Sequence, residues 1–306
     1  MLVTEIKCKA TTPIFIAGTE TNKPELRAAS IKGIMRYIWR AVQCAPDINT
    51  LREKEGQLFG NANGDGTIVS PLRLQVVADR VEQGKVSMVP HRDLSEEYDG
   101  KGKSFQVSAA AFKIGSTFTV RIITNAKVSQ EQHNMYVHLF VLMTILAGFG
   151  RRTRKGMGSV VITSITGDAK DVNFSIDKHQ DLLPLLNFVS NKEIGTIYKA
   201  DINAIWSVPV TKPFNYPYIE YIFIWKPISK GIEPIHVTQQ IGLSTHKFSN
   251  AVFTGTARPR FASSLLMSTV GDSSPSAIIT MLNCTKDFDI NKREVFLDDL
   301  YGRIVR

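Results

Sequence analysis

A glycine-rich basic segment follows the most apolar stretch of this chain. Its composition favours a loop at this position over a continued helix or strand. Residues 148–159 read GFGRRTRKGMGS, and the four basic side chains are Arg151, Arg152, Arg154 and Lys155. Glycine allows positive φ angles and close backbone approach, and arginine presents planar, permanently charged donors that suit phosphate. No Asp or Glu occurs between residues 132 and 167. The segment predicts a loop that binds a polyanion, and a solvated basic turn is the alternative interpretation.

A second basic pattern lies in residues 27–43, which read RAASIKGIMRYIWRAVQ. Its apolar residues recur with helical spacing, so we expect a helix with one buried face and with Ser30 as its N-cap. Lys32, Arg36 and Arg40 are four residues apart and share the opposite side. No acidic residue occurs from residue 26 to residue 46. The pattern predicts a positive stripe without a local counter-charge, unless it is an ordinary solvated helix face.

The order of the predicted elements indicates the fold of the first half. Alternation and β-rich composition predict the strands, and helical periodicity with a Ser129-x-x-Gln132 capping box predicts a second helix that Gly148 closes. We interpret residues 78–102 as an insertion loop. The order of strand, helix, two strands, helix and strand is the ferredoxin-like βαββαβ pattern of RNA-recognition domains. The predicted strands are 2–10, 68–77, 105–112, 116–124 and 157–165, one more than this pattern contains, and the second helix is 129–147.

Composition narrows the possible partners and compartment. The chain has 306 residues and a formal net charge of +9, which favours nucleic acid or another polyanion as a partner. Its three cysteines are far apart, without a CxxC pair, so we expect no zinc framework and a reducing cytoplasm. The first ten residues lack the pattern of a signal peptide. The longest apolar run, residues 137–147, is too short to span a bilayer, so we expect no membrane partner and no cofactor.

Four segments in order resemble one protein family. TTPIFIAG, ELRAASIKGIMRYIWRAV, LFG and GFGRRTRKGMGSV are similar to the RAMP superfamily of CRISPR proteins, and more narrowly to the first RAMP subunit of the type III-B (Cmr) RNA-targeting complex. The resemblance covers residues 11–161. It implies an α+β chain of two tandem ferredoxin-like domains, residues 1–167 and 168–306, that bind single-stranded RNA. It also implies a position beside other RAMP subunits, at the end that holds the 3′ part of the CRISPR RNA.

The resemblance also implies which residues contact RNA. In the helix it implies Arg27, Ser30, Lys32, Arg36 and Arg40. In the loop it implies Arg151, Arg152, Thr153, Arg154 and Lys155, with Gly150, Gly156 and Gly158 giving access to the backbone. In the second half, TGTARPRFASSLL resembles the corresponding second-domain motif and adds Arg258 and Arg260, although a basic loop without a ligand is an equal alternative.

The second half gives weaker patterns. We expect strands at 201–208, 218–225 and 277–284, a short helix at 182–188, and an amphipathic helix at 292–303. In that last helix Val295, Phe296 and Leu300 are expected to face inward. Four aromatic residues, Phe214, Tyr216, Tyr218 and Tyr221, are candidates for base stacking, but core packing is the commoner role for such residues.

The sequence shows no assembled catalytic set. No HExxH or GxSxG motif is present, and His91 and His246, in segments without strong periodicity, are the only histidines that suit a metal-independent RNA cleavage. We therefore expect a non-catalytic single-stranded RNA-binding subunit of a type III-B CRISPR effector complex, acting in antiviral defence on the CRISPR RNA or its target. The alternatives are a metal-independent CRISPR RNA-processing endoribonuclease of the same superfamily and a protein-interaction scaffold.

Overall fold

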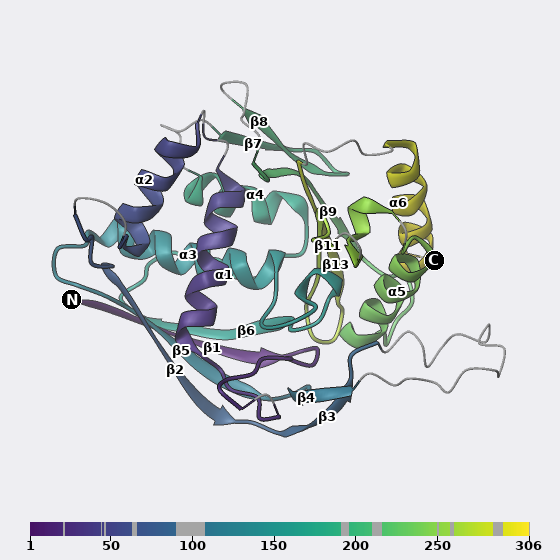
Figure 1. The fold of residues 1–306 in the computed structure, drawn as a ribbon, viewed down its shortest axis with the longest axis horizontal. Helices are drawn as coiled ribbons and strands as arrows, with labels where there is room; N and C mark the ends of the chain where they lie inside the picture. Colours follow the sequence, from purple (N-terminus) through teal and green to yellow (C-terminus); the bar gives the residue numbers. More distant parts are fainter. Residues whose placement is uncertain are drawn as a thin grey trace.

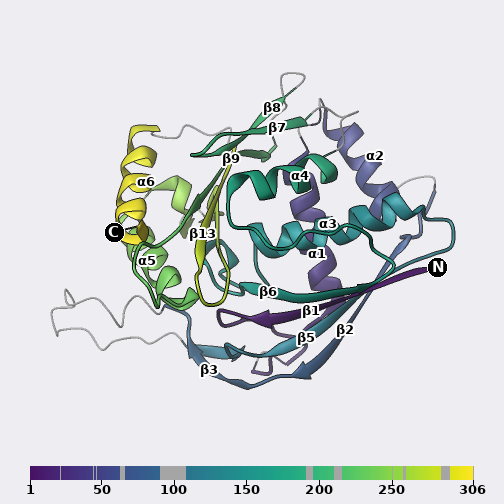
Figure 2. The same cartoon turned by 180° about the vertical axis from the view of Figure 1, so that it is seen from behind.

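Among the described residues, the molecule consists of two larger antiparallel sheets of four and five strands, two two-stranded hairpins, and helices between and beside the larger sheets (Figures 1 and 2). The computed structural model describes residues 1–20, 22–43, 45, 47–62, 66–89, 108–190, 196–209, 216–249, 251–257, 260–283 and 290–305. The elements of the first half are β1 (Leu2–Ala10), α1 (Ala28–Val42), α2 (Ile48–Phe59), β2 (Leu72–Arg80), β3 (Gln83–Ser87), β4 (Ser108–Phe112), β5 (Thr117–Thr124), α3 (Gln130–Leu146), the 3-10 turn η2 (Thr153–Lys155) and β6 (Val160–Gly167). Those of the second half are α4 (His179–Val189), β7 (Thr196–Ala200), β8 (Ile205–Pro209), β9 (Ile219–Trp225), α5 (Pro234–Lys247), η4 (Val252–Thr254), β10 (Thr256–Ala257), β11 (Arg260–Phe261), β12 (Leu265–Val270), β13 (Ser276–Leu282) and α6 (Ile290–Val305).

The first sheet confirms the βαββαβ prediction. Its strand order is β2-β5-β1-β6, and all neighbours are antiparallel. Strands β1, β2, β5 and β6 are the first, second, third and fourth strands of the βαββαβ motif. The third strand lies between the second and the first, and the fourth lies beside the first, as in ferredoxin-like folds. Thr4, Ile6 and Cys8 alternate toward the core as expected. The predicted insertion loop is partly wrong, because β3 lies within it and pairs with β4 as a separate hairpin.

The C-terminal part of helix α3 is buried on all sides and joins the two halves. Its buried residues run almost without interruption from Tyr136 to Leu146, which is the pattern of a helix enclosed by other elements. It packs on α1, α4 and the first sheet, and also on β12 and β13 of the second sheet. The expected Ser129 cap is confirmed, since its hydroxyl accepts the N–H of Gln132 at 3.1 Å. Because the core runs through α3 into both sheets, a division at residue 167/168 stays a prediction.

The second sheet repeats most of the same motif, but a different strand occupies the position beside its first strand. Its order is β12-β13-β9-β8-β7, and β9, α5, β12, β13 and α6 follow each other as βαββα. The position beside β9, where a fourth strand of the motif would lie, is occupied by β8. Because β8 precedes β9 in the chain and pairs with it in an antiparallel manner, the sequence order of the second half differs from the βαββαβ pattern of the first.

Two local expectations about helices are wrong. Ser30 does not cap α1: the helix begins at Ala28 with Arg27 in the N-cap position and without a side-chain cap. Ala28 and Ala29 are good helix formers, so the helix extends one turn further than the cap signal suggested. In α6, Phe296 and Leu300 are fully buried, but Val295 is 57% exposed, because the inward face follows the i, i+4 spacing.

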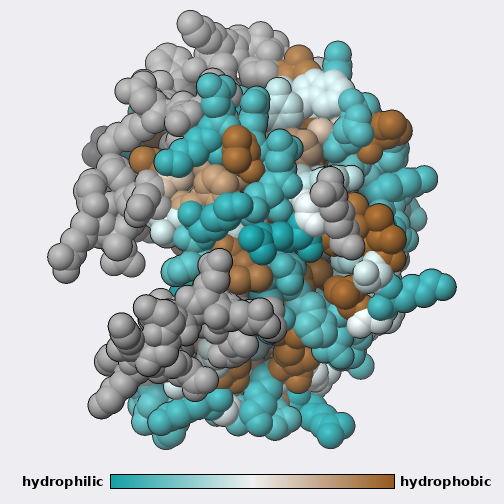
Figure 3. Space-filling view, turned by 90° about the vertical axis from the view of Figure 1, so that its right-hand side faces the viewer, coloured by the Kyte–Doolittle hydropathy of each residue, from teal (hydrophilic) through white to brown (hydrophobic). Residues whose placement is uncertain are grey.

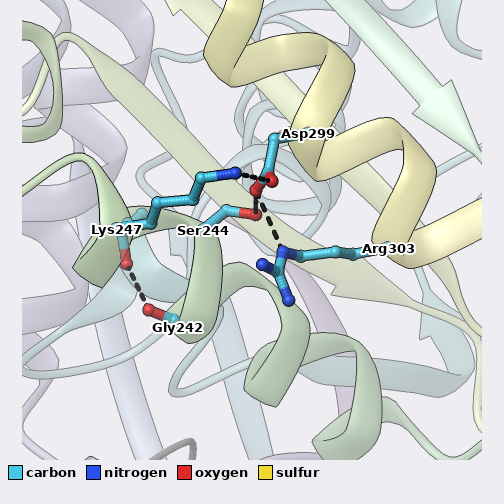
Figure 4. A network of polar contacts seen from close by, with 6 residues as sticks. Gly242, Ser244, Lys247, Asp299 and Arg303 are labelled. Carbon is cyan, nitrogen blue, oxygen red and sulfur yellow. Dashed lines mark hydrogen bonds and ion pairs between the residues drawn. The ribbon is translucent and has the colours of Figure 1, made fainter. Parts of the chain in front are cut away.

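A carboxylate on α6 fixes this helix to α5 (Figure 4). Asp299 accepts hydrogen bonds from Ser244 Oγ and Lys247 Nζ, both at 2.7 Å, and from Arg303 Nε at 2.9 Å. Burial raises the pKa of Asp299, but the bonds from Lys247, Ser244 and Arg303 outweigh burial and lower the pKa to about 2. The charged form of Asp299 is therefore the form that stabilises the contact between the two helices.

Close backbone contacts explain two glycines of the basic loop. Gly150 and Gly158 have φ angles of 89° and 74°. A Cβ at Gly150 would lie 2.3 Å from Phe15 O, and one at Gly158 would lie 2.1 Å from Phe149 O. The N–H groups of Gly156 and Gly158 donate to Met267 O at 2.8 Å and Pro13 O at 3.0 Å. Both amides are thus used within the protein, contrary to the expectation that they give RNA access to the backbone.

We predict that Asp299→Asn lowers the free energy of unfolding at neutral pH by about 1 kcal/mol, the value for a partly solvated carboxylate with a lowered pKa. The difference from the wild type should disappear as the pH falls from the ordinary pKa of 3.8 toward about 2, because the wild-type carboxylate is protonated over that range. Urea unfolding as a function of pH measures this. Asp298→Asn, on the exposed side of the same helix, should have little effect, and an equal loss in both variants would contradict the role of Asp299.

Gly158→Ala should destabilise the protein by roughly 2 kcal/mol or more, because alanine combines a positive φ with a backbone clash. Gly33→Ala is the matched control: Gly33 lies in α1, and a Cβ there meets nothing within 4 Å. That change should stabilise the fold by about 0.5–1 kcal/mol, as expected for Gly→Ala inside a helix. Urea unfolding of both variants tests the pair, and a Gly158→Ala protein as stable as the wild type would show that the loop packs differently.

Candidate nucleic-acid interface

Helix α1 and the basic loop lie beside each other. Arg154 Nη2 donates to Tyr37 Oη at 2.9 Å, and its guanidinium carbon is 5.4 Å from the centre of the Tyr37 ring. Tyr37 belongs to α1 and Arg154 to η2. The contact brings the two basic groups into one region of the surface. We call this region the α1–loop surface; its basic residues are Arg27, Lys32, Arg36, Arg40, Arg151, Arg152 and Arg154.

The positive stripe on α1 has a counter-charge, contrary to expectation. Glu55 Oε1 is 2.6 Å from both Arg36 Nε and Arg40 Nη1. The Glu55 side chain is 7% exposed, whereas the two arginine side chains are 39% and 38% exposed. Glu55 comes from α2, which lies outside the acid-free window of the sequence, and Asp47 caps that helix. One carboxylate shared by two guanidinium groups leaves an excess positive charge at the surface.

Lys32, in the same row of α1 as Arg36 and Arg40, contacts the segment that leads into β2. Its Nζ donates to Ser70 Oγ and, at 3.1 Å, to Leu72 O at the start of β2. Burial, and then the nearby charge of Arg36, lower the pKa of Lys32. These bonds hold Lys32 against the first sheet, so it contributes positive charge from a fixed position.

The loop divides into an anchored part and an exposed part. Arg154 donates to Ser263 O, and Lys155 Nζ donates to Thr254 O at 2.9 Å. Burial lowers the pKa of Lys155 to about 8, with further contributions from Arg152 and Arg154. Both side chains thus fasten the loop to the second half. Arg151 and Arg152 are exposed and remain the loop cations most accessible to a ligand.

Small residues lie on the exposed face of α1 between the two basic groups. Ala29 and Gly33 are exposed, four residues apart, and therefore adjacent along the helix. Arg27 is exposed at the N-cap position, and Ser30 is half-buried in the first turn. A chain lying on this face could approach the helix backbone closely while arginines contact it from both sides.

A pocket that the sequence did not predict lies at the end of this surface. It has a volume of about 390 Å³ and lies between α1, α2 and the segment before β9. Tyr37, Arg40, Arg52 and Tyr216 contribute polar and aromatic groups to its lining. Arg52 gave no signal because the pattern of α2 mixes both charge signs, and only the fold brings it next to Arg40.

The remaining predicted site residues lie elsewhere or outside the described residues. Thr153 is half-buried at the start of η2, and Gly150 is half-buried beside Phe15. Arg260 lies in β11, where its partner is Ala257 of β10. Arg258, His91 and Phe214 lie outside the described residues. His246 lies in the last turn of α5 rather than in a loop.

The aromatic candidates of the second half divide between core and surface. Tyr216 and Tyr218 are each 8% exposed, which confirms core packing, whereas Tyr221 is 38% exposed. Among the described residues, no group of three or more His, Cys, Asp or Glu side chains could hold a metal ion. In the same part of the chain, no helix has the length and apolar character needed to cross a membrane.

Known proteins share this fold. The CRISPR system Cmr subunit Cmr1-2 of Pyrococcus furiosus is 26% identical over 175 residues, which cover 50% of this chain and 91% of that protein. The crystal structure of apo Cmr1 from Pyrococcus furiosus superimposes with a TM-score of 0.62 at 18% identity, over 94% of this chain and 89% of that one. A chain of the type III-B Cmr-beta complex bound to cognate target RNA also gives 0.62, at 14% identity, over 99% of this chain and 100% of that one. The model of the RAMP superfamily matches residues 7–161, and this chain therefore belongs to the RAMP superfamily.

Proposed function

We propose that this chain is a non-catalytic, single-stranded RNA-binding subunit of a type III-B CRISPR effector complex, located in the cytoplasm. The observation that supports this most directly is the Arg154–Tyr37 contact, because it places the loop arginines and the α1 arginines on one surface. The similarity to Cmr1, and to a chain of a Cmr complex bound to target RNA, supports the same assignment. The RNA is the 3′ part of the CRISPR RNA or its target, and other RAMP subunits are the neighbours.

The geometry suits recognition of the RNA backbone. Guanidinium groups bind phosphate oxygens in a bidentate manner and without regard to base identity. Arg151 and Arg152 are exposed on one side, and Arg36 and Arg40 are partly exposed on the other. If these side chains neutralise about four phosphates, the logarithm of the binding constant should fall with the logarithm of salt concentration with a slope near −3. The function requires no cofactor and no chemical step.

The double variant Arg151→Glu/Arg152→Glu should weaken binding of single-stranded RNA by at least about tenfold and reduce the magnitude of the salt slope by about two units. Fluorescence anisotropy over a salt series measures both quantities, and the RNA should be recovered intact with or without divalent metal. The matched control is Lys170→Glu/Lys199→Glu, the same charge change at exposed lysines outside the α1–loop surface. If the two double variants lose affinity equally, binding reflects overall charge and the proposed surface is wrong.

Glu55→Gln should strengthen RNA binding several-fold, because it removes the carboxylate that two arginines share. The salt slope should become steeper by up to about one unit. Since Glu55 is buried and ion-paired, we also expect lower stability, which urea unfolding measures separately. Glu53→Gln, an exposed position on the same helix, is the control. A Glu55→Gln protein that is folded and binds RNA no more tightly than the wild type would show that Arg36 and Arg40 do not contact RNA.

A further inference from the structure

A groove between β9 and α6 lies outside the α1–loop surface. It has a volume of about 530 Å³. Its apolar lining includes Ile202, Phe223, Trp225, Leu297, Tyr301 and Val305. Figure 3 shows the side of the molecule that carries α5 and α6, where apolar patches lie among hydrophilic side chains. RNA binding by α1 and the basic loop gives this groove no role.

Aromatic rings form a continuous row along the groove. The rings of Tyr221 and Phe223 are nearly parallel, with their centres 6.3 Å apart. The ring centres of Phe223 and Trp225 are 5.8 Å apart. Tyr301 of α6 meets Trp225 edge-on at 5.4 Å. The Tyr301 side chain is 46% exposed and that of Ile202 is 83% exposed. Accessible aromatic and aliphatic side chains in a concave surface are typical anchors for a binding partner.

The charged groups of the groove are mostly acidic. Glu294 and Asp298 line it from α6, and both are exposed. Lys226 also lines it, but its Nζ is 3.4 Å from Asp177 Oδ1. Asp201 precedes Ile202, and bonds from the N–H groups of Ala204 and Asn203 lower its pKa. The groove therefore presents negative charge on a chain whose net charge is +9.

His179, which also lines the groove, contributes no positive charge to it. Its Nε2 accepts the N–H of Ile224 at 3.0 Å, so it acts as an acceptor in its neutral form. Burial lowers its pKa, which favours the same form. Phosphate groups would thus meet carboxylates in the groove rather than cations, and this disfavours RNA as the occupant.

We propose that this groove is a docking site for an extended segment of another protein chain that carries arginine or lysine between apolar residues. The basic groups would pair with Glu294 and Asp298 and lie on the rings of Trp225 and Tyr301, where cation–π attraction adds to the ion pairs. The apolar residues would cover Ile202 and Leu297. The network of Asp299 holds α6 against α5 (Figure 4) and so fixes the wall that carries Glu294, Asp298 and Tyr301.

The test uses the full-length chain and two labelled peptides of equal length, one alternating arginine with leucine and the other alternating glutamate with leucine. Fluorescence anisotropy should show binding of the arginine peptide and none of the glutamate peptide. We expect two groove variants, the double variant Glu294→Lys/Asp298→Lys and the single variant Tyr301→Ala, each to lower the affinity for the arginine peptide by roughly tenfold or more. Glu53→Lys/Glu131→Lys makes the same charge change at exposed helix positions of the first half and should leave binding nearly unchanged. Urea unfolding confirms that each variant is folded.

Three outcomes would overturn the proposal. The first is an arginine peptide that does not bind, and the second is binding that survives both groove variants. The third is a Tyr301→Ala protein that loses affinity for single-stranded RNA and not for the peptide, which would make the aromatic row a base-stacking site. Because the variants leave Arg151 and Arg152 in place, failure of this proposal does not affect the RNA-binding proposal, and the reverse also holds.

Discussion

The hydrogen bond from Gly156 N–H to Met267 O, 2.8 Å long, is the contact on which the arrangement of this chain depends. It joins the loop after α3 to strand β12, and Lys155 and Arg154 reinforce it by donating to Thr254 O and Ser263 O. Four cations in five residues would repel one another in a free loop. Backbone carbonyls of the second half stabilise two of them, so the loop can keep a fixed conformation while Arg151 and Arg152 face solvent.

Helix α3 provides the scaffold that makes this contact possible. Because its C-terminal part is buried on every side, it can pack against both sheets and present its C-terminal end at their junction. The loop leaves α3 at this junction, and Gly150 and Gly158 allow it to pass within van der Waals distance of the Phe15 and Phe149 carbonyls. The position of the arginines beside α1 is therefore a consequence of core packing rather than of charge.

The fold also separates charges of opposite sign. On the α1–loop surface, the carboxylate of Glu55 is buried beneath Arg36 and Arg40 and orients them without cancelling their combined charge. In the groove between β9 and α6, the acidic side chains are exposed and the one lysine is paired. A basic chain that keeps an acidic, aromatic groove can bind a polyanion on one surface while a cationic partner occupies another.

The sequence by itself determined the βαββαβ order of the first half, the Ser129 cap and the two basic motifs, because periodicity, capping and glycine content are local properties of the chain. The family assignment followed from the same motifs. Only the tertiary structure decided that Glu55 neutralises part of the α1 stripe, that Arg154 and Lys155 fasten the loop, and that β8 takes the edge beside β9. The aromatic row of Phe223, Trp225 and Tyr301 likewise exists only where β9 meets α6. These features depend on contacts between residues that are from 15 to 109 positions apart, and local periodicity carries no information about such pairs.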